Sequence, residues 1–211
     1  MVVSNYPRSD RVVLYNLNWE QFNRLLEDLE ESRSHRLAYD NGSLEIMTPL
    51  PDHERYKNAL SLAIQDMADL LNLEYECLGS TTWKREAKSA GVEPDDCFYF
   101  QNERQIRGLS RFDLDRDPPP DLALEIDLTN KSINRLPIYA RLGVPEVWNY
   151  DVERGELTIY RLREGEYRIT ENSEIFPPIQ IREIPAILNR SGDEGRLASR
   201  RRFRDWLQQQ L

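Results

Sequence analysis

Residues 118–127 read Pro-Pro-Pro-Asp-Leu-Ala-Leu-Glu-Ile-Asp, and this stretch decides the predicted fold. In a β-strand, successive side chains point to opposite faces, so this strand would have one apolar face and one acidic face. The apolar face would hold Leu122, Leu124 and Ile126, and the acidic face would hold Asp121, Glu125 and Asp127, together with Ala123. A central strand normally has both faces covered. Three carboxylates on one face therefore predict a cationic partner for that face.

The residues after this strand predict a parallel crossover. Asn130 or Asn134 can cap a helix that runs to about Leu142, and Gly143 just beyond it is typical of a helix end. The apolar run at 147–151 then predicts a second strand. Parallel strands need a crossover connection, so a strand, a helix and a strand in this order indicate a βαβ unit.

Periodicity and turn residues predict the remaining elements. Apolar residues recur at helical spacing in two segments, which Asn18 and Asp52 can cap. Asn41-Gly42 can supply the positive φ angles of a tight hairpin turn. The predicted elements are helices at 19–31 and 53–71, hairpins at 36–47 and 156–171, and short strands at 73–78 and 81–84. The expected fold class is α/β, a mixed β-sheet flanked by helices with an extra N-terminal helix and hairpins.

The length and composition are typical of a folded domain. The chain has 211 residues, of which 39% are hydrophobic and 31% are charged. Such a chain can bury a core, and its periodic apolar segments exclude a disordered protein. We expect a single domain over residues 1–211, with a core at about 35–190 and a basic helical tail at 191–211.

Charge and cysteine content limit the partners. The formal net charge of −9 opposes non-specific attraction to nucleic acid or to an anionic membrane. Two basic segments could still bind phosphates: the loop at 101–120, which could equally be a solvated connector, and the arginines at 200–204. For these arginines we favour a role in offsetting the acidic remainder of the protein or in docking to another subunit. Cys77 and Cys97 match no metal-ligand spacing and are interpreted as small buried hydrophobes, as in a reducing cytoplasm.

The sequence contains no segment typical of export or membrane insertion. The N-terminus lacks a basic segment followed by an apolar run, and no stretch approaches the roughly 20 apolar residues of a membrane span. We therefore expect a cytoplasmic protein that does not enter a membrane. Composition leaves homodimerisation open.

Two carboxylates predict a metal site. Asp95 follows Pro94 at the start of an apolar strand near 97–100, and the loop that follows could join this strand to an antiparallel neighbour that carries Glu125. If the two strands are neighbours, Asp95 and Glu125 meet at one end of the sheet. Two carboxylates and a backbone carbonyl provide the hard oxygen ligands that Mg²⁺ or Mn²⁺ prefers. The usual task of such a site is phosphoryl transfer to water.

Two further residues are candidates for this site. Lys131 lies four residues beyond Asp127 and could fold back to orient the nucleophile and neutralise the phosphate. His53 falls in the first turn of the helix predicted at 53–71, where either a structural or a catalytic role fits its position.

The chain resembles the PD-(D/E)xK nuclease superfamily. Within it, the chain more closely resembles a large bacterial family of putative restriction endonucleases first catalogued as a domain of unknown function. The resemblance covers roughly residues 15–190 and rests on five pieces in the right order. These pieces are the hairpin with Gly42 and Met47-Thr48-Pro49, the helix that begins near His53, Glu93-Pro94-Asp95, the segment 120–126, and the segment from Tyr139 to Trp148.

The resemblance implies a restriction-endonuclease-like core with Asp95 and Glu125 as ligands of Mg²⁺ or Mn²⁺. It also exposes a departure, because Asp127 stands where the superfamily typically has a lysine. Lys131 could have taken over that role, Asp127 could be a third metal ligand, or the site could have lost activity. We favour Lys131 with Asp127 as an additional ligand.

The leading hypothesis is a metal-dependent endonuclease that hydrolyses DNA phosphodiester bonds. The main alternative is a catalytically inactive nucleic-acid-binding or assembly module on a nuclease scaffold, and Asp127 and the net charge support it. A glycosidase with a carboxylate pair is disfavoured, because no aromatic sugar platform is evident. A purely structural interpretation is also open, in which Asp121 caps the proline turn, Glu125 pairs with an arginine and Asp127 caps the next turn.

Overall fold

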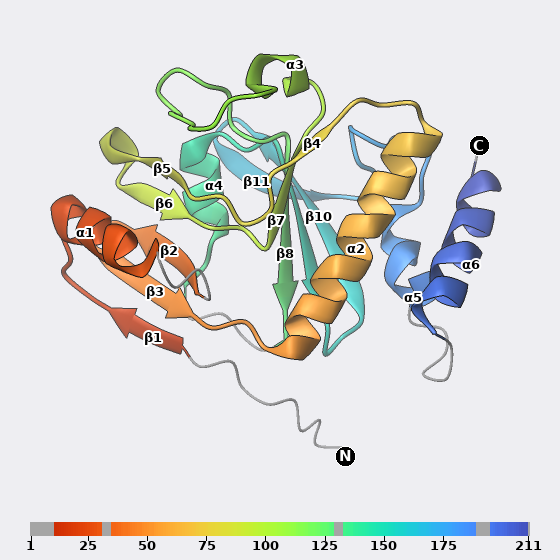
Figure 1. The fold of residues 1–211 in the computed structure, drawn as a ribbon, viewed down its shortest axis with the longest axis horizontal. Helices are drawn as coiled ribbons and strands as arrows, with labels where there is room; N and C mark the ends of the chain where they lie inside the picture. Colours follow the sequence, from red (N-terminus) through yellow and green to blue (C-terminus); the bar gives the residue numbers. More distant parts are fainter. Residues whose placement is uncertain (1–10, 31–34, 129–132, 189–194, 211) are drawn as a thin grey trace.

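The computed structural model describes residues 11–30, 35–128, 133–188 and 195–210, and it contains two β-sheets flanked by helices (Figure 1). The five-stranded sheet has the order β1-β3-β2-β6-β5, and the six-stranded sheet has the order β11-β10-β9-β8-β7-β4. The first sheet comprises β1 (Arg11–Leu14), β2 (Arg36–Asp40), β3 (Ser43–Met47), β5 (Trp83–Arg85) and β6 (Ala90–Val92). The second comprises β4 (Glu76–Cys77), β7 (Asp96–Tyr99), β8 (Leu122–Asp127), β9 (Glu146–Asp151), β10 (Glu156–Arg163) and β11 (Glu166–Thr170).

The five-stranded sheet is built on the predicted hairpin. Asn41 and Gly42 adopt φ angles of 46° and 92°, the left-handed conformation that a tight turn between β2 and β3 requires. Helix α1 (Trp19–Glu30) packs on this sheet, where Phe22 stacks on Tyr39 with 4.6 Å between the ring centroids. The cap predicted at Asn18 is confirmed, since its Oδ1 accepts a hydrogen bond from the backbone N–H of Gln21 at 2.9 Å.

The opening stretch of the sequence forms β8, in the middle of the six-stranded sheet. β8 pairs in parallel with β9 and antiparallel with β7. Helix α4 (Leu136–Leu142) connects β8 to β9, so the predicted βαβ crossover is confirmed. Gly143 ends this helix in the left-handed conformation, with φ 85°, as its position predicted.

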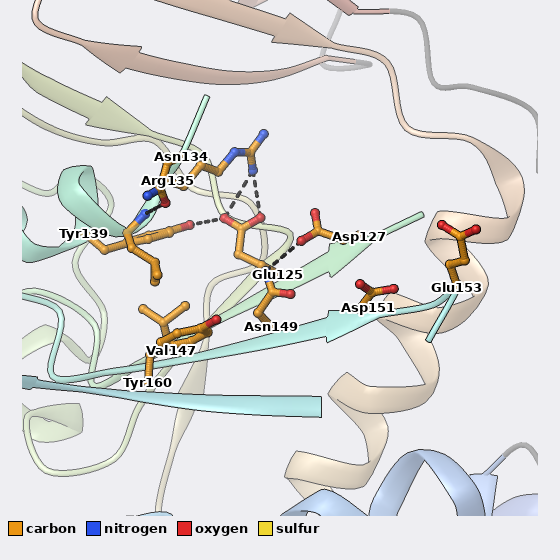
Figure 2. A pocket seen from close by; sticks show the side chains of 11 residues that line it. Glu125, Asp127, Asn134, Arg135, Tyr139, Val147, Asn149, Asp151, Glu153 and Tyr160 are labelled. Carbon is orange, nitrogen blue, oxygen red and sulfur yellow. Dashed lines mark hydrogen bonds and ion pairs between the residues drawn. The ribbon is translucent and has the colours of Figure 1, made fainter. Parts of the chain in front are cut away.

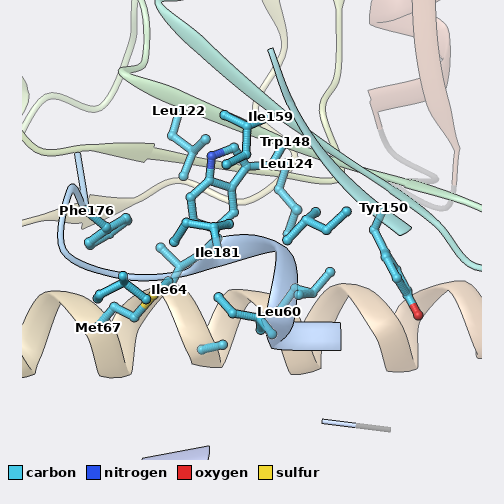
Figure 3. Close-up of a cluster of buried hydrophobic side chains, with 14 of the residues drawn as sticks. Leu60, Ile64, Met67, Leu122, Leu124, Trp148, Tyr150, Ile159, Phe176 and Ile181 are labelled. Carbon is cyan, nitrogen blue, oxygen red and sulfur yellow. The ribbon is translucent and has the colours of Figure 1, made fainter. Parts of the chain in front are cut away.

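The long helix α2 (Pro51–Leu70) covers the apolar face of β8. Figure 3 shows Leu60, Ile64 and Met67 of this helix pointing toward Leu124 and Trp148 of the sheet. These side chains are buried in one continuous core, which stabilises the contact through removal of apolar surface from water. The cap predicted at Asp52 is wrong: the helix begins at Pro51, two residues earlier than predicted, Leu50 is its N-cap residue, and Asp52 falls within the first turn.

The C-terminal helices pack outside α2 in Figure 1. They are α5 (Ile184–Leu188) and α6 (Arg196–Gln208), which follow the short 3₁₀ turn η2 (Ile181–Glu183). Asp66 of α2 is buried, and its carboxylate accepts hydrogen bonds from Arg200 at 2.8 and 2.9 Å and from Arg204 at 3.0 Å. The arginine cluster of the tail therefore docks on an acidic group of the same chain, in line with the preferred interpretation of this segment.

Replacing Asp66 by alanine is expected to lower the free energy of unfolding by about 2 kcal/mol, below the usual range for a broken buried pair because both arginines can reach water. Burial alone would raise the pKa of Asp66, but hydrogen bonds from Arg200 and Arg204 lower it below its ordinary value of 3.8. The ionised form thus stabilises the fold above that value, and this contribution is lost as the pH falls through the lowered pKa. Urea unfolding at pH 7 and pH 3 measures both effects, and an unchanged unfolding midpoint in D66A would contradict the docking role.

Some predicted strand positions differ from the structure. The segment predicted as strands at 73–78 and 81–84 yields only β4 and β5, which belong to different sheets. Cys97 is buried as predicted, whereas the prediction that Cys77 is buried is wrong, because Cys77 lies exposed on the short edge strand β4. The loop at 101–120 also contains a single-turn helix, α3 (Glu103–Ile106). A short 3₁₀ helix, η1 (Glu86–Lys88), lies between β5 and β6.

Within the described ranges, no helix combines the length and the apolar composition needed to cross a lipid bilayer.

Candidate active site

The register of β7 and β8 brings Asp95 and Glu125 together. Asp96 pairs with Leu124, and Asp95 continues this pairing by donating its N–H to the carbonyl oxygen of Leu124 at 3.1 Å. Asp95 thus lies at the end of this ladder, next to the part of β8 that carries Glu125. The prediction that these two strands are antiparallel neighbours is confirmed.

Asp95 lies just before β7 and is buried among polar contacts. It is 1% exposed, and its Oδ2 accepts a hydrogen bond from the backbone N–H of Ile126 at 2.7 Å. The same oxygen lies 3.1 Å from Nε2 of His53. Burial alone would raise the pKa of Asp95, but the hydrogen bond and charge of His53 lower it to about 2. Within the described part of the chain, its other oxygen, Oδ1, is buried and has no hydrogen-bond partner.

His53 lies in the first turn of α2 and is 3% exposed, so a surface role is excluded. Burial lowers the pKa of His53, whereas the hydrogen bond and the negative charge of Asp95 raise it, and the net shift is upward. The cationic imidazolium is thus favoured beside Asp95. Asp95 could not be recognised from the sequence as the partner of His53, because the two residues belong to different elements and lie 42 positions apart along the chain.

Glu125, in the middle of β8, is held by two residues of the crossover connection. Arg135 Nη1 donates to Oε1 at 3.1 Å and to Oε2 at 2.9 Å, and the hydroxyl of Tyr139 donates to Oε1. Figure 2 shows the guanidinium and the phenol meeting the carboxylate from the α4 side. All three side chains are buried. The acidic face of β8 therefore has the cationic partner that its sequence predicted, and that partner is Arg135.

Arg135 also links the two sheets. Its Nη2 donates to Oε1 of Glu45 on β3 at 3.3 Å, while its Nη1 binds Glu125 on β8. Arg135 is 3% exposed. Burial lowers the pKa of Arg135, but the negative charges of Glu125, Asp95 and Glu45 raise it by more than burial lowers it, so the guanidinium stays charged. Its Nε is buried without a hydrogen-bond partner among the described residues.

A pocket of about 290 Å³ opens beside this cluster. It is lined by Glu125, Asp127, Asn134, Arg135, Leu136, Tyr139, Val147, Asn149, Asp151, Glu153 and Tyr160. Asp127 ends β8, and its Oδ2 accepts a hydrogen bond from the Nδ2 of Asn149 at 2.8 Å. Figure 2 shows Asp127, Asp151 and Glu153 following one another along one side of the pocket. The pocket therefore has a cationic end at Arg135 and an acidic side.

Two further candidates have other outcomes. Asp121 has a structural role, because its Oδ2 accepts hydrogen bonds from the backbone N–H groups of Phe100 at 2.7 Å and Gln101 at 2.9 Å. Lys131 lies outside the described residues. Within the described ranges, no group of three or more histidine, cysteine, aspartate and glutamate side chains could hold a metal ion, so Asp95, Glu125 and Asp127 are not placed as one such group.

Sequence reasoning missed Arg135, Tyr139 and Glu45. Arg135 and Tyr139 are four residues apart, a spacing that places both side chains on one face of a helix. Their position just after an acidic strand in a βαβ unit could have indicated a contact with Glu125. Glu45 gave no such indication, because it comes from the other sheet.

Comparison with known families bears on this arrangement. Residues 19–188 match the model of the family described as Uma2, putative restriction endonuclease. The chain belongs to this family. Its fold is also similar to a crystal structure from Anabaena variabilis, described as a putative nuclease of the family DUF820, with a TM-score of 0.51 and 13% sequence identity over 71% of this chain and 89% of that one. No curated protein matches the chain.

These comparisons confirm two predictions. The chain is a member of the predicted restriction endonuclease family, and its two helix-flanked sheets form the expected restriction-endonuclease-like fold. Membership of the family supports a nuclease function for the protein.

Proposed function

We propose that the protein is a metal-dependent endonuclease that hydrolyses DNA phosphodiester bonds, with Asp95 and Glu125 as ligands of Mg²⁺ or Mn²⁺. The observation that carries this proposal is the buried Oδ1 of Asp95, an ionised carboxylate oxygen without a hydrogen-bond partner among the described residues. A buried charged oxygen is costly when it has no partner. Glu125 lies on the neighbouring strand, and a cation bound by both carboxylates would supply the partner that Oδ1 of Asp95 lacks.

The donor set fits a hard divalent cation. Asp95 and Glu125 offer carboxylate oxygens, and the backbone carbonyls of β8 lie on the same strand end. A metal ion bound there would polarise the phosphate and lower the pKa of a bound water. Asp127 lies two residues beyond Glu125 on the same face, and its role as an additional ligand stays a prediction.

The surrounding residues orient the two ligands. His53 contacts Oδ2 of Asp95, while Oδ1 has no hydrogen-bond partner among the described residues. Tyr139 fixes one oxygen of Glu125. Asp127 stands where the superfamily typically has a lysine, so the positive charge of that lysine is missing here. Arg135 supplies this charge instead, and it can bind an oxygen of the scissile phosphate. Lys131 remains the second candidate for this charge.

The alternative is a nucleic-acid-binding module without cleavage activity. It is favoured by the occupancy of Glu125, whose oxygens both accept hydrogen bonds from Arg135. A cation would have to compete with this ion pair. Binding to DNA that depends on salt but never leads to metal-dependent cleavage would support this alternative.

Plasmid DNA incubated with the purified protein tests the proposal. We expect cleavage with Mg²⁺ or Mn²⁺, no cleavage with EDTA, and no cleavage by E125A with either metal. E171A is the matched control, because Glu171 is an exposed carboxylate outside the pocket, and its cleavage rate should equal that of the original protein.

Cleavage that survives in E125A would remove Glu125 from the site. If the original protein binds DNA but cleaves it with neither metal, the proposal is wrong and the alternative, a nucleic-acid-binding module, replaces it.

A further inference from the structure

Glu45 is a buried charge that the proposed reaction does not use. It lies in the middle of β3, on the five-stranded sheet, and it is 0% exposed. Burial of a carboxylate costs on the order of several kcal/mol unless a partner compensates. Arg135, which precedes α4 in the crossover connection, compensates it through Nη2 at 3.3 Å. A buried glutamate at this place therefore requires an explanation beyond packing.

Arg135 divides its guanidinium between two carboxylates. Nη1 binds both oxygens of Glu125, and Nη2 binds Glu45, so the two contacts use different nitrogens. A divalent cation at Glu125 would need the oxygens that Nη1 now occupies. Two cations at one carboxylate repel each other strongly in a buried site. Metal binding therefore requires Arg135 to give up Glu125 while remaining buried beside it.

We infer that Glu45 is a positioning residue that retains Arg135 when a divalent cation takes the oxygens of Glu125. This inference rests on the proposed metal site. With Glu45 in place, the guanidinium keeps a buried counter-ion through Nη2 after Nη1 has left Glu125. Arg135 lies nearer to Glu125, at 2.9 Å, than to Glu45, at 3.3 Å. Without the contact to Glu45, Arg135 would keep its ion pair with Glu125 and compete with the metal ion for that carboxylate.

The same contact has a consequence for substrate binding. A guanidinium anchored on Glu45 stays at the cationic end of the pocket, and Nη1 and the unpartnered Nε become donors for an anion. A phosphodiester has the charge and the oxygen geometry that an arginine binds best. Glu45 thereby keeps the arginine available to the phosphate and away from the metal ligand.

Titration calorimetry with Mn²⁺ alone tests the inference on the full chain. The variants are E45D, R135Q and the double variant E45D/R135Q. Aspartate keeps the charge of Glu45 but shortens its reach, so the electrostatic field at the metal site is preserved. We expect the dissociation constant for Mn²⁺ to rise about tenfold in E45D, the size of one lost charge-assisted hydrogen bond. R135Q should bind Mn²⁺ more tightly than the original protein.

The double variant decides whether Glu45 acts through Arg135. In the R135Q background, E45D should change the dissociation constant by less than about twofold, because no guanidinium remains to be positioned. A merely structural role would lower the affinity equally in both backgrounds, and that result would overturn the inference. Thermal unfolding of each variant is measured in parallel. If E45D does not fold, E45Q is measured instead, and an unchanged affinity in E45Q would likewise overturn the inference.

The outcomes separate this inference from the proposed function. If the original protein binds no Mn²⁺, the proposed metal site is wrong, and the proposed role of Glu45 is wrong with it. Mn²⁺ binding that is normal in E45D overturns the role of Glu45 alone and leaves the metal site standing.

Discussion

Replacing Asp95 by asparagine is expected to lower metal-dependent DNA cleavage by at least about a hundredfold, the usual cost of removing one group that stabilises the transition state. The amide keeps the size of the side chain and an oxygen that can still accept the N–H of Ile126. It loses the charge that a metal ion requires. The loss should therefore appear in cleavage rate and in Mn²⁺ affinity, while the helix and strand content stays that of the original protein.

The next residue provides a matched control. Asp96 is also buried, but its oxygens accept hydrogen bonds from Ser61 on α2 and from Cys77 on β4, on the face of β7 that lies against α2. D96N should lower stability and leave the dissociation constant for Mn²⁺ unchanged. Equal losses of Mn²⁺ affinity in D95N and D96N would mean that Asp95 acts through stability and would contradict its role as a ligand.

Replacing Arg135 by glutamine is expected to lower the free energy of unfolding by about 3–5 kcal/mol, the range for removal of one partner from a buried ion pair. The variant leaves Glu45 and Glu125, two carboxylates that are 0% and 1% exposed, without their shared guanidinium. Urea unfolding at pH 7 measures the loss. Because a cation can replace the missing charge, Mn²⁺ should raise the unfolding midpoint of R135Q more than that of the original protein.

Arg141 is the control for this loss, because it lies on the same helix, α4. Its Nη2 binds Asp40 at 2.6 Å, but both side chains are 28% exposed. A partly exposed pair of this kind contributes at most about 1 kcal/mol. A loss in R141Q as large as that in R135Q would show that the effect comes from α4 in general and would contradict the role of the Glu45–Arg135–Glu125 contact.

Local features of the sequence were sufficient to predict the elements that position the site. The alternation of residues 121–127 predicted both faces of β8, since a side-chain period of two is a property of any strand. Asn41-Gly42 predicted its hairpin because few other residues tolerate positive φ angles. Gly143 predicted the end of α4 for the same reason. Each of these predictions depends on neighbours in sequence.

The contacts within the site could not be predicted in this way. Arg135 and Glu45 are separated by 90 positions in sequence, and their contact exists only because the five-stranded sheet packs beside the six-stranded one. No periodicity within either segment encodes that arrangement. The sequence indicated that a cation belongs on the acidic face of β8 and offered a metal ion, Lys131 or, in the structural interpretation, an unspecified arginine. The structure places an arginine there, Arg135, which the sequence did not identify.

Residues near the two ends of the chain show the same difference between local features, which the sequence predicts, and long-range contacts, which it does not. The capping role of Asn18 followed from its place before a run of apolar residues at helical spacing, and the structure bears it out. The partner of the arginines at 200–204 could not be identified, because Asp66 lies 134 positions before Arg200 on a helix whose sequence shows no unusual feature there. Burial of Cys77 failed for a related reason: a strand-like sequence does not state whether the strand lies at the edge of a sheet.

A crystal structure of the protein soaked in Mn²⁺, with the anomalous scattering of manganese recorded, tests the central proposal most directly. We predict a manganese peak in contact with Oδ1 of Asp95 and with the carboxylate of Glu125, and Arg135 Nη1 withdrawn from Glu125. No peak at this pair, or Asp95 and Glu125 separated by more than a bridging water, would contradict the proposed metal site.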